Sequence, residues 1–180
     1  MKVFFVRHGK NDDSYRGGWS SLDLIPEGIR QAKQLAKYLK ENTRDYAIAQ
    51  IVSSDLPRAM TTANIIASEL GLPVQEEFQI REANNGDLAG MPNHIANEKY
   101  PGLFFSSLGM NEAYPNGESP NDFYRRIKEW FSAFISDCRN EESNVLVVTH
   151  GGVINVIYHL VKGMEWSNKG PVFKAGNCSI

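Results

Sequence analysis

Two apolar runs in this chain end in a histidine followed by glycine, one near each end of the sequence. The first run covers residues 3–6 and leads into Arg7-His8-Gly9, and the second covers 145–149 and leads into His150-Gly151-Gly152. A short continuous apolar run is typical of a strand that is buried on both faces of a parallel sheet. In open α/β sheets, ligands bind beyond the carboxyl ends of such strands. The sequence therefore predicts one site that is built from both halves of the chain.

Each histidine taken alone has a simpler structural explanation. A histidine ring at the end of a strand can have a purely structural role, in which it donates a hydrogen bond to a backbone carbonyl. Two matched units of strand, histidine and glycine, one of them with the adjoining Arg7, favour a functional site instead.

Length and composition restrict the class of protein. With 180 residues, of which 42% are hydrophobic and 22% charged, the chain is long enough for one globular domain spanning residues 1–180. A net charge of -2 argues against nucleic acid or an anionic membrane as a partner. The first apolar run is too short for a signal peptide or a membrane span. Because Cys138 and Cys178 form no metal-binding or redox motif, we expect a reduced, cytoplasmic setting.

The remaining pattern alternates strands with helices. Apolar residues at helical spacing predict helices over residues 26–41, 57–70, 120–138 and 152–162. Apolar runs predict strands at 2–7, 48–52, 74–80 and 145–149, with a weaker signal at 172–180. Residues 83–118, rich in Gly, Asn and Pro, are expected to be irregular. The order predicts an α/β fold, a three-layer αβα sandwich around a mostly parallel sheet.

Two further polar residues lie where such a fold places ligands. Arg58 falls in the first turn of a predicted helix, directly after a strand and the segment Ser53-Ser54-Asp55. Glu82 ends the next predicted strand, and Gly86 and Gly90 behind it indicate a tight loop that can fold over a pocket. An arginine or glutamate in such a place is commonly only solvated, so neither residue is decisive alone.

Taken in order, these motifs resemble the histidine phosphatase superfamily, the phosphoglycerate-mutase-like proteins. Beyond the Arg-His-Gly and Thr-His-Gly-Gly segments, the matches in family order are Asp23, Gly28, residues 53–59, Glu82 with Gly86 and Gly90, and Gly117-Glu118-Ser119 with Arg126. The resemblance implies a phosphoglycerate-mutase-like sandwich and a phosphohistidine intermediate. By position it implies that His8 is the nucleophile, that Glu82 is the proton donor, and that Arg7, Arg58 and His150 hold the phosphate.

The chemistry of these side chains agrees with that implication. A phosphate monoester is a dianion, and arginine guanidinium groups bind its oxygens in pairs. Two guanidiniums beside an imidazole lower its pKa, so His8 is expected to be neutral and nucleophilic near pH 7. The sequence has neither a metal-ligand motif nor a Walker-type glycine loop, so we expect no metal and no cofactor.

The chain departs from the family pattern directly after Arg-His-Gly. Many relatives carry an acidic residue and then Thr there, with an Asn three positions further on, whereas this chain has Lys10-Asn11 and then Ser14. We expect Asn11, Ser14 and Gly151 to complete the phosphate site.

The segment 83–118 is expected to be a lid that determines specificity. It has one lysine, Lys99, no arginine and many apolar residues, whereas a mutase needs cationic groups for the second acidic end of its substrate. This favours a phosphatase acting on a small phosphorylated metabolite. The alternatives are a cofactor-dependent phosphoglycerate mutase and a non-catalytic phosphate-binding scaffold. The sequence does not fix the oligomeric state, and a homodimer stays open.

Overall fold

The computed structural model describes residues 1–138 and 143–180. In this part of the chain four strands form one sheet in the order β1-β4-β2-β3, and every neighbouring pair is parallel. The strands are β1 (Val3–Arg7), β2 (Ile48–Ser53), β3 (Val74–Glu76) and β4 (Asn144–Thr149). The parallel sheet confirms the predicted fold class.

The pairing of β1 with β4 positions the two histidines. Val3 lies opposite Val145 and Arg7 lies opposite Thr149, so the first and last strands end at the same level. His8 and His150 follow directly, and the backbone N–H of His8 donates to the carbonyl of Thr149 at 2.9 Å. The predicted convergence of the two ends of the sequence is confirmed.

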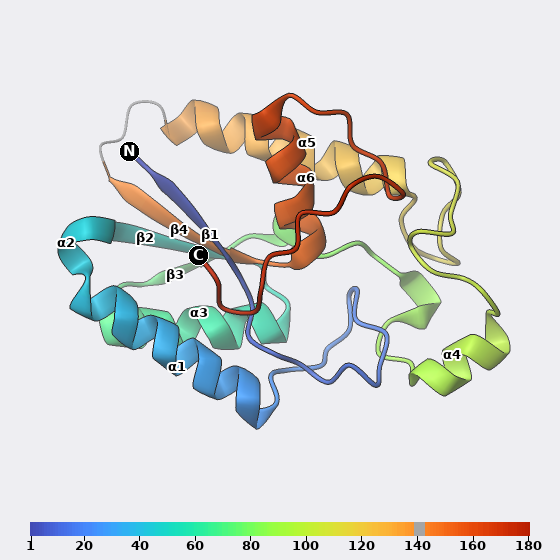
Figure 1. Cartoon of the computed structure of the whole chain (residues 1–180), viewed down its shortest axis with the longest axis horizontal. Helices are drawn as coiled ribbons and strands as arrows, with labels where there is room; N and C mark the ends of the chain where they lie inside the picture. Colours follow the sequence, from blue (N-terminus) through green and yellow to red (C-terminus); the bar gives the residue numbers. More distant parts are fainter. Residues whose placement is uncertain (139–142) are drawn as a thin grey trace.

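Helices cover both faces of the sheet (Figure 1). On one face lie α1 (Pro26–Glu41) and α3 (Pro57–Leu70), whose buried residues pack against Leu146 and Val148 of β4. On the other lie α5 (Pro120–Cys138) and α6 (Gly151–Lys162), packed against Val145 and Val147. Alternate residues of a strand point to opposite faces, so the central strand supplies both halves of the core. The aromatic side chains of α5 belong to this core: Phe123, Trp130, Phe131 and Phe134.

Local sequence signals explain where the main helices begin and end. Pro26 and Pro57 occupy the first turns of α1 and α3, where a missing N–H costs nothing. The hydroxyl of Ser119 accepts from the backbone N–H of Asp122 at 3.1 Å, and the Asp122 carboxylate accepts in return from Ser119. This reciprocal capping fixes the start of α5 as predicted.

Three segments differ from the sequence prediction. Only 74–76 of the expected strand 74–80 pairs with β2, because the chain turns into a 3-10 helix at Phe78–Ile80. The segment expected to be irregular contains α4 (Asn93–Lys99) and a 3-10 turn at Gly86–Leu88. No strand forms at 172–180 in the described chain, where the tail reaches β1 through one backbone bond, from Cys178 to Arg7, and then turns.

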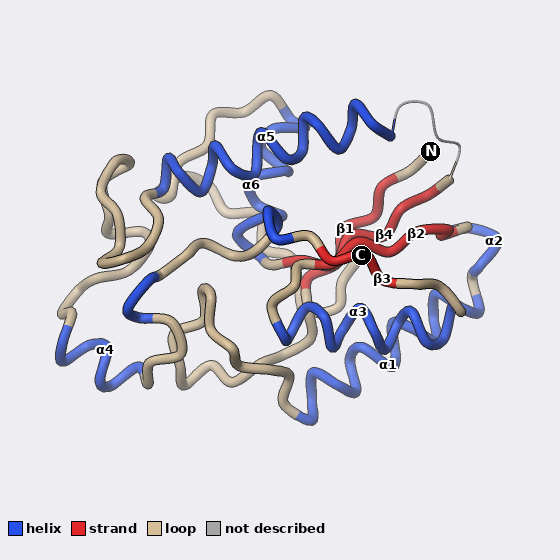
Figure 2. The backbone as a smooth tube through the Cα atoms, turned by 180° about the vertical axis from the view of Figure 1, so that it is seen from behind, coloured by secondary structure: helices blue, strands red, loops and turns tan. Residues whose placement is uncertain are grey.

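The loops gather at one end of the molecule, together with α4, beyond the carboxyl ends of the strands (Figure 2). They have a small core of their own, made by Leu88, Leu108 and Tyr114. A short α2 (Thr43–Tyr46) lies at the opposite end, before β2. Within the described residues, no helix has the length and apolar character needed to cross a membrane.

Candidate active site

His8 lies at the end of β1 with its ring almost fully buried, 4% exposed. Its Nδ1 is 2.7 Å from the carbonyl oxygen of Gly9. Because a carbonyl can only accept, Nδ1 carries the proton and Nε2 keeps a free electron pair. Nε2 accepts a hydrogen bond from Nε of Arg58 at 3.3 Å. The neutral tautomer with a nucleophilic Nε2 is therefore fixed by the backbone.

The surroundings of His8 disfavour its protonated form. Burial lowers the pKa of His8 to about 3; the Arg58 and Arg7 charges add to the shift, and the hydrogen bond to Gly9 opposes it. The ring is therefore neutral at physiological pH, as the sequence predicted, but the main cause is burial rather than the two guanidiniums.

His150, at the end of β4, faces the same point. The ring centroids of His8 and His150 are 5.1 Å apart. His150 is fully buried, and its Nε2 lies 2.8 Å from the hydroxyl of Ser54, which follows β2. Burial holds the pKa of His150 well below its usual value, and the Arg58 charge adds to this effect. His150 is therefore a second neutral imidazole.

Arg58 projects from the first turn of α3 toward the histidines and is 2% exposed. Its two terminal nitrogens donate to the carbonyls of Gly18 at 2.7 Å and Ser20 at 3.4 Å. Gly18 has φ of +56°, and a Cβ there would lie 1.8 Å from a side-chain oxygen of Asn85. Only glycine fits this turn, which brings a carbonyl within reach of the guanidinium.

Arg7 completes the cationic side of the cluster. One of its terminal nitrogens donates to the carbonyl of Ala175 at 3.1 Å, so the C-terminal tail holds the guanidinium in place. A Cβ on Gly151 would lie 3.6 Å from Nε of Arg7, which puts Arg7 beside the start of α6.

Three buried polar atoms in this region have no hydrogen-bond partner among the described residues: Nε of Arg7, Nδ1 of His150 and Oγ of Ser20. Buried polar groups are almost always paired, because an unpaired one costs about 1–3 kcal/mol. Unpaired groups gathered beside two guanidiniums can be satisfied together by a bound anion. The geometry is therefore suited to binding phosphate.

Glu82 approaches this cluster from the loop after the 3-10 helix 78–80. Its carboxylate accepts hydrogen bonds from the backbone N–H groups of Ala83 and of Gly152 in α6, both at 3.0 Å. Its carbonyl accepts from the indole of Trp19 at 2.7 Å and from Arg126 at 3.2 Å. These bonds hold the carboxylate beside the N-terminus of α6, where His150 is the capping residue.

Glu118 supports the same loop from behind and does not join the cluster. It forms a two-bond ion pair with Arg126, at 2.7 and 2.8 Å, and accepts from the backbone N–H of Asn84. Arg126 also donates to the carbonyls of Gln79 and Arg81. Glu118 and Arg126 thus brace the segment that carries Glu82.

The structure brings together Arg7, His8, Arg58, Glu82 and His150, with Gly151 at the edge of the cluster. Ser14 stands apart, because its side chain is exposed and its hydroxyl donates to Asp12. Asn11 is half-buried and forms a backbone bridge with Leu24. The roles of Asn11, Ser14 and Gly151 in phosphate binding stay predictions.

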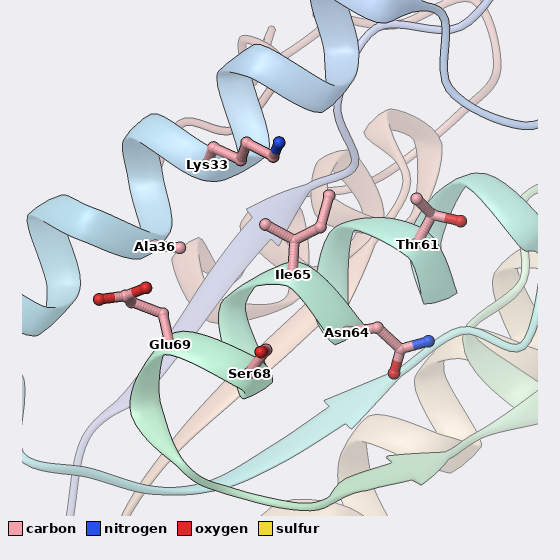
Figure 3. Close-up of a pocket in the computed structure, with 7 residues that line it drawn as sticks. All are labelled: Lys33, Ala36, Thr61, Asn64, Ile65, Ser68 and Glu69. Atoms are coloured by element: carbon pink, nitrogen blue, oxygen red, sulfur yellow. The ribbon is translucent and has the colours of Figure 1, made fainter.

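A cavity of about 320 Å³ adjoins Glu82 and Gly152. Its other lining residues come from three loop segments: Arg16, Gly17, Gly18, Ala83, Asn85, Phe104, Phe105 and Tyr114. Sequence reasoning missed Arg16, because an arginine in a polar loop carries no signal by itself. A second hollow, about 660 Å³, lies between α1 and α3 and is lined by residues such as Lys33 and Glu69 (Figure 3); none of the clustered residues borders it.

Comparison with known proteins identifies the family. The family model of the histidine phosphatase superfamily, branch 1, matches residues 3–180. The chain belongs to this superfamily. A 2,3-bisphosphoglycerate-dependent phosphoglycerate mutase of Cytophaga hutchinsonii is 30% identical over 168 residues, covering 89% of this chain and 77% of the mutase. An uncharacterized phosphatase, PhoE, of Bacillus subtilis is 30% identical over 164 residues, with the same coverage of 89% and 77%.

Solved structures of this superfamily share the fold. A mycobacterial glucosyl-3-phosphoglycerate phosphatase superposes with a TM-score of 0.78 at 27% identity, covering 97% of this chain and 86% of the other. A putative alpha-ribazole-5'-P phosphatase of Escherichia coli also gives 0.78, at 28% identity, covering 92% and 81%. The protein is thus an enzyme of the phosphoglycerate-mutase-like group, and the expected histidine phosphatase activity fits these relatives.

Proposed function

We propose that this histidine phosphatase hydrolyses a small phosphate monoester through a phosphohistidine formed on Nε2 of His8. The observation that carries the proposal is the state of His8. The ring is neutral, its proton is fixed on Nδ1 by the Gly9 carbonyl, and Nε2 points to the guanidinium of Arg58. A nucleophile beside a cation is suited to attack a bound dianion.

In the first step, Nε2 of His8 attacks phosphorus and the bond from phosphorus to the ester oxygen breaks. Arg7 and Arg58 bind the equatorial oxygens, where preorganised donors supply ~3–4 kcal/mol each. If the Ser54 hydroxyl donates to Nε2 of His150, then Nδ1 of His150 carries a proton for the same oxygens. Glu82 enters this step as the protonated acid, gives its proton to the leaving oxygen and becomes a carboxylate.

In the second step, water attacks the phosphorus of phosphohistidine. The Glu82 carboxylate takes a proton from the water, and the electron pair of the N–P bond returns to Nε2 of His8. Inorganic phosphate leaves, and the enzyme regains its starting state. Among the described residues no three potential metal ligands of the His, Cys, Asp or Glu type are grouped together, and the steps above are written with side chains alone.

A covalent trap tests the mechanism. Wild-type enzyme mixed with a ³²P-labelled monoester and quenched in base should retain the label in an acid-labile, base-stable form. His8→Ala should retain none and should show no turnover, while its circular dichroism spectrum matches that of wild type. Substantial turnover by His8→Ala would overturn the covalent mechanism.

A mutase is the competing activity, since mutases are among the relatives. Within the described lining of the cavity beside Glu82, Arg16 is the one cationic side chain. A bisphosphate with further acidic groups would need more positive charge, so we favour hydrolysis. With 3-phosphoglycerate and 2,3-bisphosphoglycerate present, we expect release of phosphate and little 2-phosphoglycerate, both followed by ³¹P NMR. Rapid isomerisation would refute this preference.

A further inference from the structure

The cavity beside Glu82 is where the alcohol part of a substrate has to lie. The Glu82 carboxylate borders both the histidine cluster and this cavity, because it accepts from Gly152 at the start of α6. A proton donor lies next to the leaving oxygen, so the group attached to that oxygen extends into the cavity. Its volume, about 320 Å³, is at the small end of ordinary ligand sites.

Arg16 is held rigidly on one wall of the cavity. Its backbone N–H donates to the carbonyl of Met91 and its carbonyl accepts from Gly90, both at 2.8 Å. One terminal nitrogen donates to the side chain of Asn97, in α4, at 2.7 Å. Within the described structure its Nε is buried and has no partner. A positioned cation with an unused donor is suited to an anionic group that arrives with the substrate.

Aromatic side chains form another part of the cavity wall. The guanidinium of Arg16 lies over the ring of Phe104, 4.1 Å from its centroid. The rings of Phe105 and Tyr114 stack at 6.4 Å with 20° between their planes. Phe104 lines the cavity and is 43% exposed even though Arg16 lies over its ring, so part of this side chain is open to a ligand. An aromatic ligand can pack against such side chains in an offset-stacked or edge-to-face arrangement.

We propose that the cavity selects monoesters of an aromatic alcohol that carries a carboxylate, with Arg16 binding the carboxylate and Phe104 contacting the ring. The proposal rests on the hydrolase function proposed above. It assigns Arg16 the role of a specificity-determining residue that does not act on the transferred phosphoryl group. Burial raises the pKa of Tyr114 to about 12, so its hydroxyl remains a hydrogen-bond donor on the same wall.

Four substrates distinguish the contact of Arg16 with the carboxylate from the contact of Phe104 with the ring: phenyl phosphate, 3-carboxyphenyl phosphate, ethyl phosphate and 2-carboxyethyl phosphate. Each variant is compared with wild type on the same substrate, so that intrinsic reactivity cancels. Arg16→Gln should raise KM about 10-fold for the two carboxylated esters and leave their kcat nearly unchanged. Both constants should stay nearly unchanged for the two esters that lack a carboxylate. Phe104→Ala should raise KM for the two aryl esters several-fold more than for the two alkyl esters.

Two matched variants control for charge and for ring loss. Arg30→Gln removes an exposed arginine on α1, and Phe173→Ala removes a ring that is also 43% exposed but does not line the cavity. Neither should change the preference between substrates. An equal loss on all four substrates in Arg16→Gln would overturn the proposal, because it would mean that Arg16 acts on the common phosphoryl group or on folding.

A binding measurement keeps the result independent of turnover. Calorimetry on His8→Ala protein should show 3-carboxyphenyl phosphate binding about 10-fold more tightly than phenyl phosphate, and Arg16→Gln should remove the difference. Equal binding of the two ligands overturns the selectivity proposal and leaves the hydrolase function standing. Failure of wild type to hydrolyse any monoester overturns the hydrolase function, whatever the binding result.

Discussion

The backbone N–H of Gly152 donates to one carboxylate oxygen of Glu82 at 3.0 Å, and no room is left between the two residues for a side chain. A Cβ on residue 152 would lie 2.2 Å from the other oxygen of Glu82. Gly152, the second glycine of the His150-Gly151-Gly152 segment, is therefore needed for the position of the carboxylate, and not only for the turn into α6.

Gly152→Ala should displace the Glu82 carboxylate and lower kcat for alkyl phosphates about 100-fold, the lower range for loss of a general acid. Alanine is the better helix former by about 1 kcal/mol, so the thermal midpoint should hardly fall. Gly109→Ala is the control, because a Cβ there meets only ordinary contacts, 3.6 Å or more from Glu112. Unchanged kcat in Gly152→Ala would show that the position of Glu82 does not matter for turnover.

Glu82→Gln tests the proton donor itself. An alkyl leaving oxygen needs a proton, whereas p-nitrophenolate departs without full protonation. The ratio of kcat/KM, variant to wild type, should therefore be much lower for ethyl phosphate than for p-nitrophenyl phosphate, within the ~10²–10⁴-fold range of general acid catalysis. Equal ratios for the two esters would reduce Glu82 to a residue that orders its loop.

Arg126→Met should destabilise the fold by about 3 kcal/mol, because it leaves Glu118 without its cation and removes a donor from the carbonyls of Arg81 and Glu82. Both side chains of this pair are largely buried, 14% and 16% exposed. The neighbouring Arg125 pairs with Asp122 at the surface, so Arg125→Met should cost less than about 1 kcal/mol. Urea unfolding of the two variants measures the difference, and similar losses would argue against the bracing role.

The low pKa of His8 predicts a pH dependence of stability. An unfolded histidine takes up a proton below about pH 6.5, whereas folded His8 takes one up only near pH 3. The free energy of unfolding is therefore fully retained above pH 6.5 and falls as pH drops from there toward 3, by up to about 1.4 kcal/mol per pH unit from this group. In His8→Asn the fall between pH 6 and pH 4 should be shallower by up to that amount. Parallel curves from urea unfolding would contradict the burial of a neutral ring.

The parts of the molecule that the sequence predicts well are those with a repeated local signal. The two apolar runs before His8 and His150 indicate buried parallel strands, and the β1–β4 register bears this out. Pro57 at the start of α3 and Gly71 after its end are strong helix signals, and Arg58 is positioned by that helix. The position of each of these site residues can be predicted because it lies at the end of a strand or the start of a helix whose limits are clear in the sequence.

The parts that sequence reasoning missed depend on tertiary contacts. The helix α4 is only seven residues long and has one buried residue, Ala96, so its apolar pattern is too weak to detect. The strand β3 ends at Glu76 and not at residue 80, because the chain bends there and brings Glu82 back toward α6. Arg16 is positioned by backbone bonds to residues 90 and 91, which no local pattern records.

The place of β4 in the sheet has a consequence for synthesis of the protein. In the described sheet β4 lies between β1 and β2, so β1 has no neighbouring strand until residues 144–149 have been made. A nascent chain that ends before Asn144 contains His8 and Arg58 but lacks β4, the strand that holds β1 and its His8 beside Arg58. Such non-local pairing slows folding. Residues 144–152 must therefore be made and must pair with β1 and β2 before His8, Arg58 and His150 can come together, so the proposed phosphate site is assembled only at a late stage of synthesis.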